Sequence, residues 1–456
     1  MVSEVSIIVA TNLALYFKTL KYRFVSDDFS VWKNPPVAKN AIHKLWLQLT
    51  GQMKFYSRSI KFLFVEKKFY IAIVKCEEFE HLYTILIHTA ICVAIYFAFG
   101  HSWTSFIAAM LYSTNPVNNQ GTIWPSGRGY ALPILFLLLA MVFPYVSPLF
   151  LFAGTWYTAG FLSPLTLIGS KFYWMLGFAP IIWFLHSRKF TKAVLNKQKT
   201  ETFKEDHIVH PKKIILGIKT LGFYTILCII PFRITFYHNF LQSSAGSMKH
   251  KNYTLCRYFW IGLFVLIGMG YYWSTVEWNT FSWALLAYLL MILPFCNIYR
   301  ANQEIAERFV SLPNVFLMYG LAQVIAPYSN LFFAFVAFYA TRTFYTLKLY
   351  QDEYYITECA VIEDENAWWA WHCRAMKRWD TQSYREALIL WVRANMISPK
   401  EFKVLVNIAA CLRLLKNDKE ADEYLALAEA NIVPGQEEQA MKFIKDHRDG
   451  KLPLLL

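Results

Sequence analysis

The chain has 456 residues, of which 56% are hydrophobic and only 17% are charged, and it carries a net charge of +14. This composition, with a positive mean hydropathy of +0.30, excludes an ordinary soluble domain and predicts a polytopic membrane protein. Basic membrane proteins commonly place Lys and Arg against anionic lipid, so we expect membrane lipid as a partner and no nucleic acid.

Apolar, charge-poor runs in residues 1–350 predict about eleven membrane-spanning helices, because a span needs roughly 20 mostly apolar residues. The runs centre near residues 4–20, 80–99, 103–114, 129–143, 145–160, 164–185, 214–240, 255–273, 280–296, 310–325 and 327–348. A first loop covers about 21–79, and a basic loop covers about 186–213. Since basic loops favour the cytoplasmic side, we expect the first loop on the other face, in the periplasm, exterior or lumen.

Residues 351–456 are more charged and repeat at a shift of 34 residues. The shift aligns Trp371 with Leu405, Ala375 with Ala409, Ala387 with Ala421, Trp391 with Leu425 and Ala394 with Ala428. This pattern predicts a short array of tetratricopeptide repeats, whose helix pairs bind peptides or proteins. A generic helical bundle is the alternative. We expect these residues to bind an acceptor or partner protein and to lie on the same face as the first loop.

Three loops that share one membrane face by parity hold the unusual polar residues. The first loop contains Asp27 and Asp28, the third (Asn115–Tyr130) contains Arg128, and the ninth (Leu293–Pro313) contains Arg300, Glu304, Glu307 and Arg308. A carboxylate can accept a proton from an attacking hydroxyl, and arginine can bind a phosphate through two hydrogen bonds.

The eight cysteines show no C-x-x-C spacing and predict neither a zinc site nor a disulfide framework.

Four stretches in this order resemble a known family. They read F-V-S-D-D-F-S-V-W-K-N-P (24–35), H-L-Y-T-I-L-I-H (81–88), N-P-V-N-N-Q-G-T-I-W-P-S-G-R (115–128) and N-I-Y-R-A-N-Q-E-I-A-E-R-F-V-S-L-P (297–313). With the C-terminal repeats, the chain resembles membrane glycosyltransferases of the GT-C fold, especially the transmembrane and tetratricopeptide-repeat O-mannosyltransferases and their bacterial relatives. The fold class expected is therefore an all-α membrane helix bundle followed by a helical repeat array.

The resemblance implies an enzyme that moves a sugar, such as mannose, from a polyprenyl- or dolichyl-phosphate donor to a protein or other surface acceptor with inversion. Asp27 or Asp28 is then the general base. The residues implied to bind the donor phosphate are Arg128 and Arg308, and Arg300 is a third candidate for the same role. Supporting residues are Glu304, Glu307, His88, Asn115, Asn118 and Trp124. No cofactor or bound metal is implied beyond the lipid-linked donor, and a need for a divalent metal stays open.

Amides occupy three positions where the family has ionisable side chains. Asn115, Asn118 and Gln120 stand in place of His-Pro-Val-His and a following Glu, and amides form hydrogen bonds but do not ionise. This difference favours a second hypothesis, a catalytically degenerate protein that serves as a structural or scaffold subunit and binds partners through its repeats. The intact Asp-Asp pair and the arginine-bearing loops favour the enzyme, and both hypotheses stay open.

Overall fold

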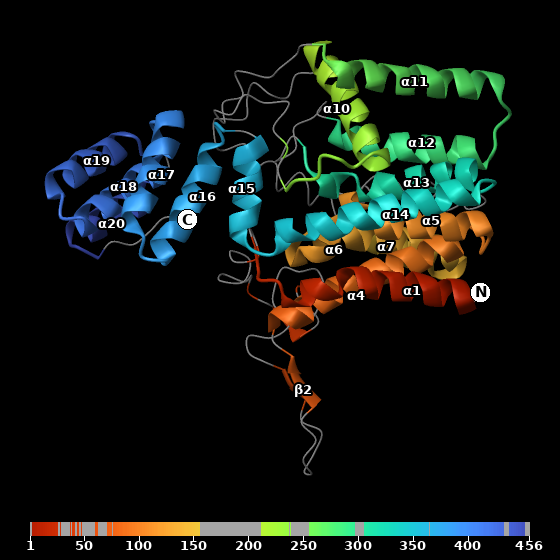
Figure 1. The fold of residues 1–456 in the computed structure, drawn as a ribbon, viewed down its shortest axis with the longest axis horizontal. Coiled ribbons are helices and arrows are strands. Elements are labelled where there is room, and N and C mark those ends of the chain that lie inside the picture. The colour runs from red at the N-terminus through yellow and green to blue at the C-terminus, as the bar shows by residue number, and fades with distance from the viewer. Residues whose placement is uncertain are drawn as a thin grey trace. The chain divides into compact units, whose positions relative to one another are not determined.

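The computed structural model of the chain is built mainly from helices (Figure 1). It describes residues 2–25, 28, 37, 39–41, 43–44, 47, 60–62, 71–74, 76–155, 211–236, 238, 255–296, 305–363, 365–432 and 437–451. The chain divides into two compact units, Met1–Ile234 with Tyr253–Asp352, and Thr235–Asn252 with Glu353–Leu456. The boundary expected between residues 350 and 351 lies close to this division.

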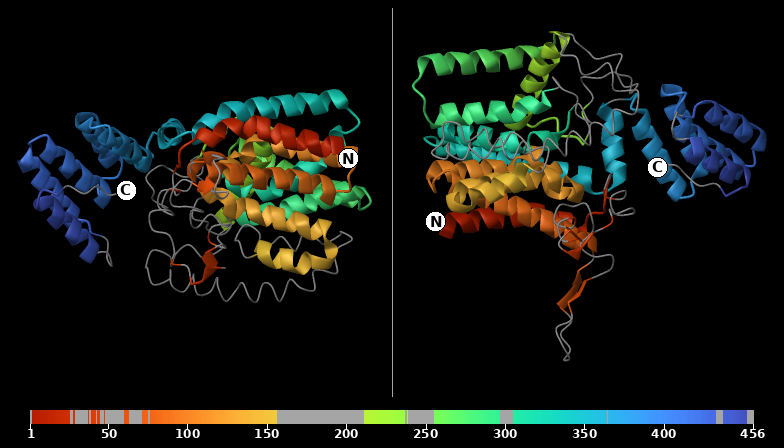
Figure 2. Two further views of the ribbon diagram at one scale, coloured as in Figure 1. Left: turned by 90° about the horizontal axis from the view of Figure 1, so that it is seen from below. Right: turned by 180° about the vertical axis from the view of Figure 1, so that it is seen from behind.

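The first unit is a helix bundle in which most helices run alongside one another (Figure 2). Among its described residues, the α-helices are α1 (Val2–Tyr16), α4 (Cys76–Ala98), α5 (Trp103–Thr114), α6 (Asn119–Ile123), α7 (Arg128–Val142), α8 (Ser147–Thr155), α10 (Pro211–Ile229), α11 (Arg257–Thr275), α12 (Thr280–Ile292), α13 (Ser311–Ile325) and α14 (Ser329–Thr346). Helix α5 is buried from Ser105 to Thr114 and packs against α4, α13 and α14. The core of the bundle therefore lies around α5.

Short 3₁₀ helices connect or extend these elements. They are η1 (Phe17–Lys21), η2 (Pro116–Asn118), η3 (Pro125–Gly127), η4 (Pro144–Val146), η10 (Leu293–Phe295), η11 (Glu307–Phe309) and η12 (Leu347–Tyr350). The first loop also contains β1 (Ile60–Phe62) and β2 (Ile71–Val74), which pair antiparallel with Ile60 opposite Val74. The all-α prediction is thus correct for the bulk of the described chain and misses this one short strand pair.

Each predicted apolar run that falls on described residues overlaps a helix, although the ends of runs and helices differ. The run at 164–185 and nearly all of the basic loop at 186–213 lie outside those residues. One predicted end is wrong, because α10 stops at Ile229 rather than near residue 240. The cause is Pro231, which has no backbone N–H to continue the helix and disfavours the helical conformation at Ile230.

Two of the described helical segments are long and apolar enough to cross a membrane, Glu78–Ala98 and Pro125–Val142. Two shorter apolar helical segments, Thr280–Phe295 and Ser311–Ile325, accompany them. These lengths support association with a membrane. The count of eleven spans and the orientation of the loops stay predictions.

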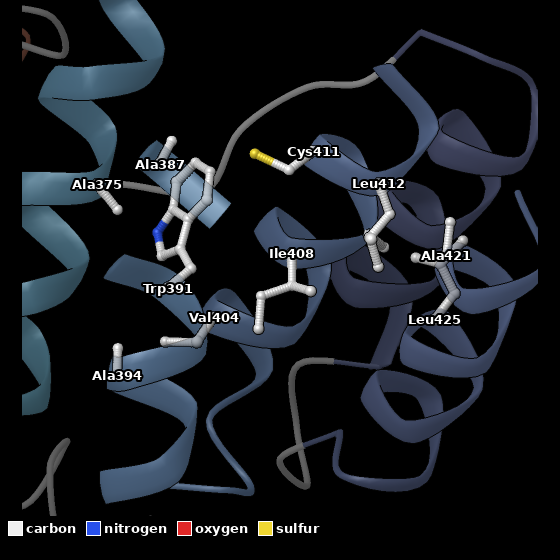
Figure 3. Packing of buried hydrophobic residues seen from close by; sticks show 11 residues of the cluster. Ala375, Ala387, Trp391, Ala394, Val404, Ile408, Cys411, Leu412, Ala421 and Leu425 are labelled. Carbon is white, nitrogen blue, oxygen red and sulfur yellow. The ribbon is translucent and has the colours of Figure 1, made fainter. Parts of the chain in front are cut away.

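The second unit contains six helices among its described residues. They are α15 (Glu353–Glu363), α16 (Trp368–Asp380), α17 (Tyr384–Ile397), α18 (Phe402–Leu414), α19 (Asp418–Ala430) and α20 (Glu437–Arg448). The pair α16 and α17 and the pair α18 and α19 begin 34 residues apart, as the sequence repeat predicts. Trp391 points between Ala375 and Ala387 (Figure 3), Ala394 lies three residues further along the same helix as Trp391, and all four are fully buried. Small residues thus let the paired helices approach around one large ring.

Candidate functional site

Three segments that are far apart in the sequence meet in the first unit. The indole N–H of Trp124 donates a hydrogen bond to the carbonyl of Val25 at 3.2 Å, which joins the third loop to the first. The backbone N–H of Arg308 donates to Oε1 of Gln120 at 2.9 Å, which joins the ninth-helix loop to the third. The described parts of all three polar loops therefore contribute to one cluster.

Asp28 contributes a carboxyl to this cluster, and its side chain is fully buried. Its Oδ1 accepts hydrogen bonds from the backbone N–H of Ser126 at 2.9 Å and from the hydroxyl of Ser126, and its Oδ2 accepts from the backbone N–H of Val25 at 3.2 Å. Burial raises the pKa of Asp28 to about 7, although these hydrogen bonds and the positive charge of Arg128 act in the opposite direction. The carboxyl can therefore gain or lose a proton near neutral pH.

The turn that presents Ser126 to Asp28 follows from its local sequence. Pro125 occupies the first turn of η3, where its missing N–H costs nothing. The N–H of Ser126 lacks a helical partner at this position and is free to donate to a carboxylate. Gly127 is required here because a Cβ would lie 2.6 Å from the carbonyl oxygen of Gln120. Close packing of residues 120–127 thus fixes the two groups of Ser126 that donate to Asp28, its backbone N–H and its hydroxyl.

Arg128, expected to bind phosphate, is completely buried and forms an ion pair with Glu80 of α4. Its Nε donates to the carbonyl of Pro125 at 2.9 Å, and its guanidinium lies 5.0 Å from the ring centroid of Tyr83. A buried charge requires such pairing to offset its desolvation. Arg128 therefore contributes to the fixed wall of the cluster, and Glu80 neutralises its charge.

Arg308 lies in a different environment, because it is only half-buried and aromatic rings surround it. Its guanidinium carbon is 5.4 Å from the ring centroid of Trp124, 5.3 Å from that of Tyr130 and 5.1 Å from that of Phe309. Such cation–π contacts restrict the position of the guanidinium. Of the two predicted phosphate-binding arginines that the structure describes, Arg308 is the better placed to meet an anion.

The three amides are buried and bond to the surrounding framework. The side chain of Asn115 donates to the carbonyl of Cys228 at 2.8 Å, and that of Asn118 donates to the carbonyl of Tyr112 at 2.8 Å. Gln120 accepts from the backbone of Arg308. These contacts connect helices and loops, so the amides stabilise the packing of the described part of the cluster.

The remaining predicted site residues separate into three groups. Glu307 is fully buried and accepts a hydrogen bond from the hydroxyl of Tyr350 at 3.5 Å. His88 lies against the rings of Tyr16 and Tyr112, with centroid distances of 5.3 and 5.7 Å, and is a packing residue of the bundle. Asp27, Arg300 and Glu304 lie outside the described residues.

Sequence reasoning missed two residues of the cluster, Ser126 and Glu80. Ser126 lies in the stretch 115–128 that carries the family resemblance, but the sequence assigned it no role. Glu80 had a usable signal, since an acidic residue at the start of an apolar helix needs a partner and Arg128 also borders an apolar run. In the part of the chain that the structure describes, no group of three or more His, Cys, Asp or Glu side chains is arranged to hold a metal ion.

Comparison with known proteins adds no relative: no protein-family model, curated protein or solved structure matches this chain. The function must therefore be argued from the geometry of the cluster itself.

Proposed function

We propose that the first unit is embedded in a membrane as a polytopic bundle. Besides the two helices of sufficient length, α11 supports this proposal because its only charged residue is Arg257, at its first position. Its exposed large side chains are Trp260 (48%), Phe264 (68%), Ile267 (57%) and Tyr271 (70%). Their spacing of three or four residues forms one apolar stripe, which water would solvate poorly and acyl chains would solvate well.

We further propose that this unit is a glycosyltransferase that uses a polyprenyl- or dolichyl-phosphate sugar as donor. The observation that carries the proposal is that the buried carboxyl of Asp28 belongs to the same cluster as Arg308, whose guanidinium lies over the ring of Trp124. Burial raises the pKa of Asp28 to about 7. A general base is most effective when its pKa lies near the working pH. A half-buried arginine suits the phosphate that leaves with the lipid.

In the proposed reaction, the acceptor hydroxyl takes the place of the Ser126 hydroxyl on Oδ1 of Asp28. Asp28 accepts the hydroxyl proton as the acceptor oxygen forms a bond to the anomeric carbon. The bond between that carbon and the phosphate oxygen breaks, and the phosphate leaves with the electron pair. Arg308 interacts with the charge that develops on the phosphate. One displacement of this kind inverts the anomeric centre and leaves no sugar on the protein.

The test is sugar transfer by the full chain in nanodiscs that contain radiolabelled dolichyl-phosphate mannose and a Ser/Thr-rich acceptor peptide. Asp28→Asn should lower kcat by roughly 100-fold or more, the usual contribution of a general base. Arg308→Gln should raise the KM for the donor by roughly ten-fold or more, because it removes a charged hydrogen-bond donor. Glu420→Gln, on an exposed position of α19, is the matched control and should behave as wild type. Equal rates for wild type and Asp28→Asn would contradict the proposal.

A second candidate is a scaffold protein that kept the bundle but not the chemistry. The closed ion pair of Arg128 with Glu80 and the structural role of Asn115 and Asn118 favour it, since these residues stabilise the bundle without any substrate. The same assay separates the two candidates. A wild-type protein that incorporates stably into nanodiscs and turns over no lipid-phosphate sugar supports the scaffold.

A further inference from the structure

One side of α17 exposes basic and apolar residues in alternation. Arg385, Ile389, Arg393 and Met396 are spaced by four, four and three residues, so they lie on one side of the helix. Ile389 and Met396 are each 68% exposed, and both arginines are exposed. We call these four residues the α17 stripe.

Arginine and tryptophan from the neighbouring helix extend the stripe. The guanidinium of Arg393 lies 5.9 Å from the ring centroid of Trp371 of α16, and that of Arg374 lies 5.5 Å from the same ring. Among the described residues, no carboxylate pairs with Arg374 or Arg393. The acidic residue of α17, Glu386, is bound to Arg378 at 3.1 Å. The positive charge beside Trp371 is therefore not neutralised within the described chain.

The second repeat shows that the repeat fold does not require this pattern. At the same positions, 34 residues later, α19 carries Lys419, Glu423, Leu427 and Ala430. Its exposed acidic residues also include Asp418, Glu420 and Asp422. The basic and apolar stripe is thus particular to the first repeat, and α19 provides an internal control of the same geometry.

We propose that the α17 stripe, with Trp371 and Arg374, binds the headgroup region of an anionic phospholipid membrane. Each basic residue near such a surface strengthens binding by about five-fold, tryptophan prefers the membrane interface, and exposed Ile and Met side chains can enter the acyl boundary. The chain also tethers the second unit to the membrane proposed for the first unit, because only Gln351 and Asp352 separate η12 of the first unit from α15 of the second. The proposal rests on the membrane location proposed for the first unit.

The test uses the full chain in nanodiscs of phosphatidylcholine alone or with added phosphatidylserine. An environment-sensitive fluorophore is attached to the cysteine of Ile389→Cys. Wild type treated with the same fluorophore gives the background signal from the native cysteines. Doxyl-labelled lipids in the nanodisc quench any fluorophore that reaches the membrane interface. We expect quenching at position 389 in anionic discs, weakened at least ten-fold by Arg385→Glu with Arg393→Glu and by high salt. Lysine at both positions should preserve it. Leu427→Cys on α19, whose side chain is 52% exposed, should stay unquenched.

Two results would overturn the proposal: a probe at 389 that is no more quenched than the one at 427 in anionic discs, or equal quenching at 389 in neutral and anionic discs. The second result would indicate an apolar contact without charge selection. Co-elution of protein and nanodisc checks separately that the first unit is in the membrane, and the sugar-transfer assay does not depend on the stripe. Failure here is therefore distinct from failure of the proposed function.

Discussion

Asp28 couples the stability of the first unit to pH, because its buried carboxyl holds its proton to a pH near 7 rather than 3.8. Between these values the folded chain binds more protons at this site than the unfolded chain does, so stability falls as pH rises. Asp28→Asn should therefore gain stability relative to wild type between pH 4 and pH 8, by at most roughly 4 kcal/mol for a shift of this size. Thermal unfolding followed by intrinsic fluorescence at several pH values measures this difference.

Ser126→Ala provides the companion variant at the same contact. It removes the hydroxyl donor to Oδ1 but keeps the backbone donor, so the pKa of Asp28 should rise further and the pH-dependent loss of stability should extend to higher pH. A stability difference between Asp28→Asn and wild type that does not change over this pH range would show that Asp28 does not titrate there.

At this scale, the sequence identified the charged residues but not their partners. Asp28, Arg128 and Arg308 were selected because their loops share one membrane face by parity, and because a carboxylate can accept a proton and an arginine can bind a phosphate. The partners depend on tertiary contacts, with Arg128 and Glu80 separated by 48 residues and Asp28 and Ser126 by 98. Periodicity and local spacing contain no information on such distances, so the assignment of Arg128 to phosphate binding did not anticipate its ion pair.

At the scale of elements, two glycines control how closely α10 and α11 approach. A Cβ at Gly222 would lie 2.0 Å from the carbonyl oxygen of Tyr258, and one at Gly262 would lie 2.0 Å from that of Ile218. Small residues permit this kind of close helix contact. Gly222→Ala should therefore separate the helices and destabilise the first unit by about 1–3 kcal/mol, measured as a lower midpoint of thermal unfolding.

Gly268 of α11 is the matched control, since nothing lies within 4 Å of a Cβ placed there. Gly268→Ala should leave stability unchanged or raise it by up to about 1 kcal/mol, because alanine favours helix. If both variants lowered the midpoint equally, the effect would come from helix conformation in general and not from the contact between α10 and α11.

The positions of the elements were largely predictable, but their contacts were not. Apolar runs located most helices of the first unit because these helices are rich in apolar residues, and the repeat of small and large residues located the four helices from α16 to α19. The end of α10 at Ile229 is set by Pro231, a local signal two residues later in the sequence. The close pair of Gly222 and Gly262 has no signal in either helix alone.

For the whole molecule, the two units expose different kinds of side chain. The first unit exposes apolar side chains such as Phe264 and Tyr271, whereas the second covers its core with charged residues on α19 and α20. Each part has its own buried core, and the core around Trp391 is made only of residues from the second unit. Damage to one core should therefore leave the other unit folded.

Trp391→Ala tests this independence. Trp391 is fully buried and its indole N–H donates to Nδ1 of His372 at 3.2 Å, so its loss should destabilise the second unit by about 3–5 kcal/mol. In limited proteolysis over a temperature series, residues after 353 should be cleaved at a lower temperature while a fragment containing α4 and α5 persists as in wild type. Ile389→Ala, on the exposed side of the same helix, should change stability by less than about 0.5 kcal/mol. If the fragment with α4 and α5 were lost together with the second unit, the two units would fold as one cooperative body, and the bundle would depend on the repeats for its stability.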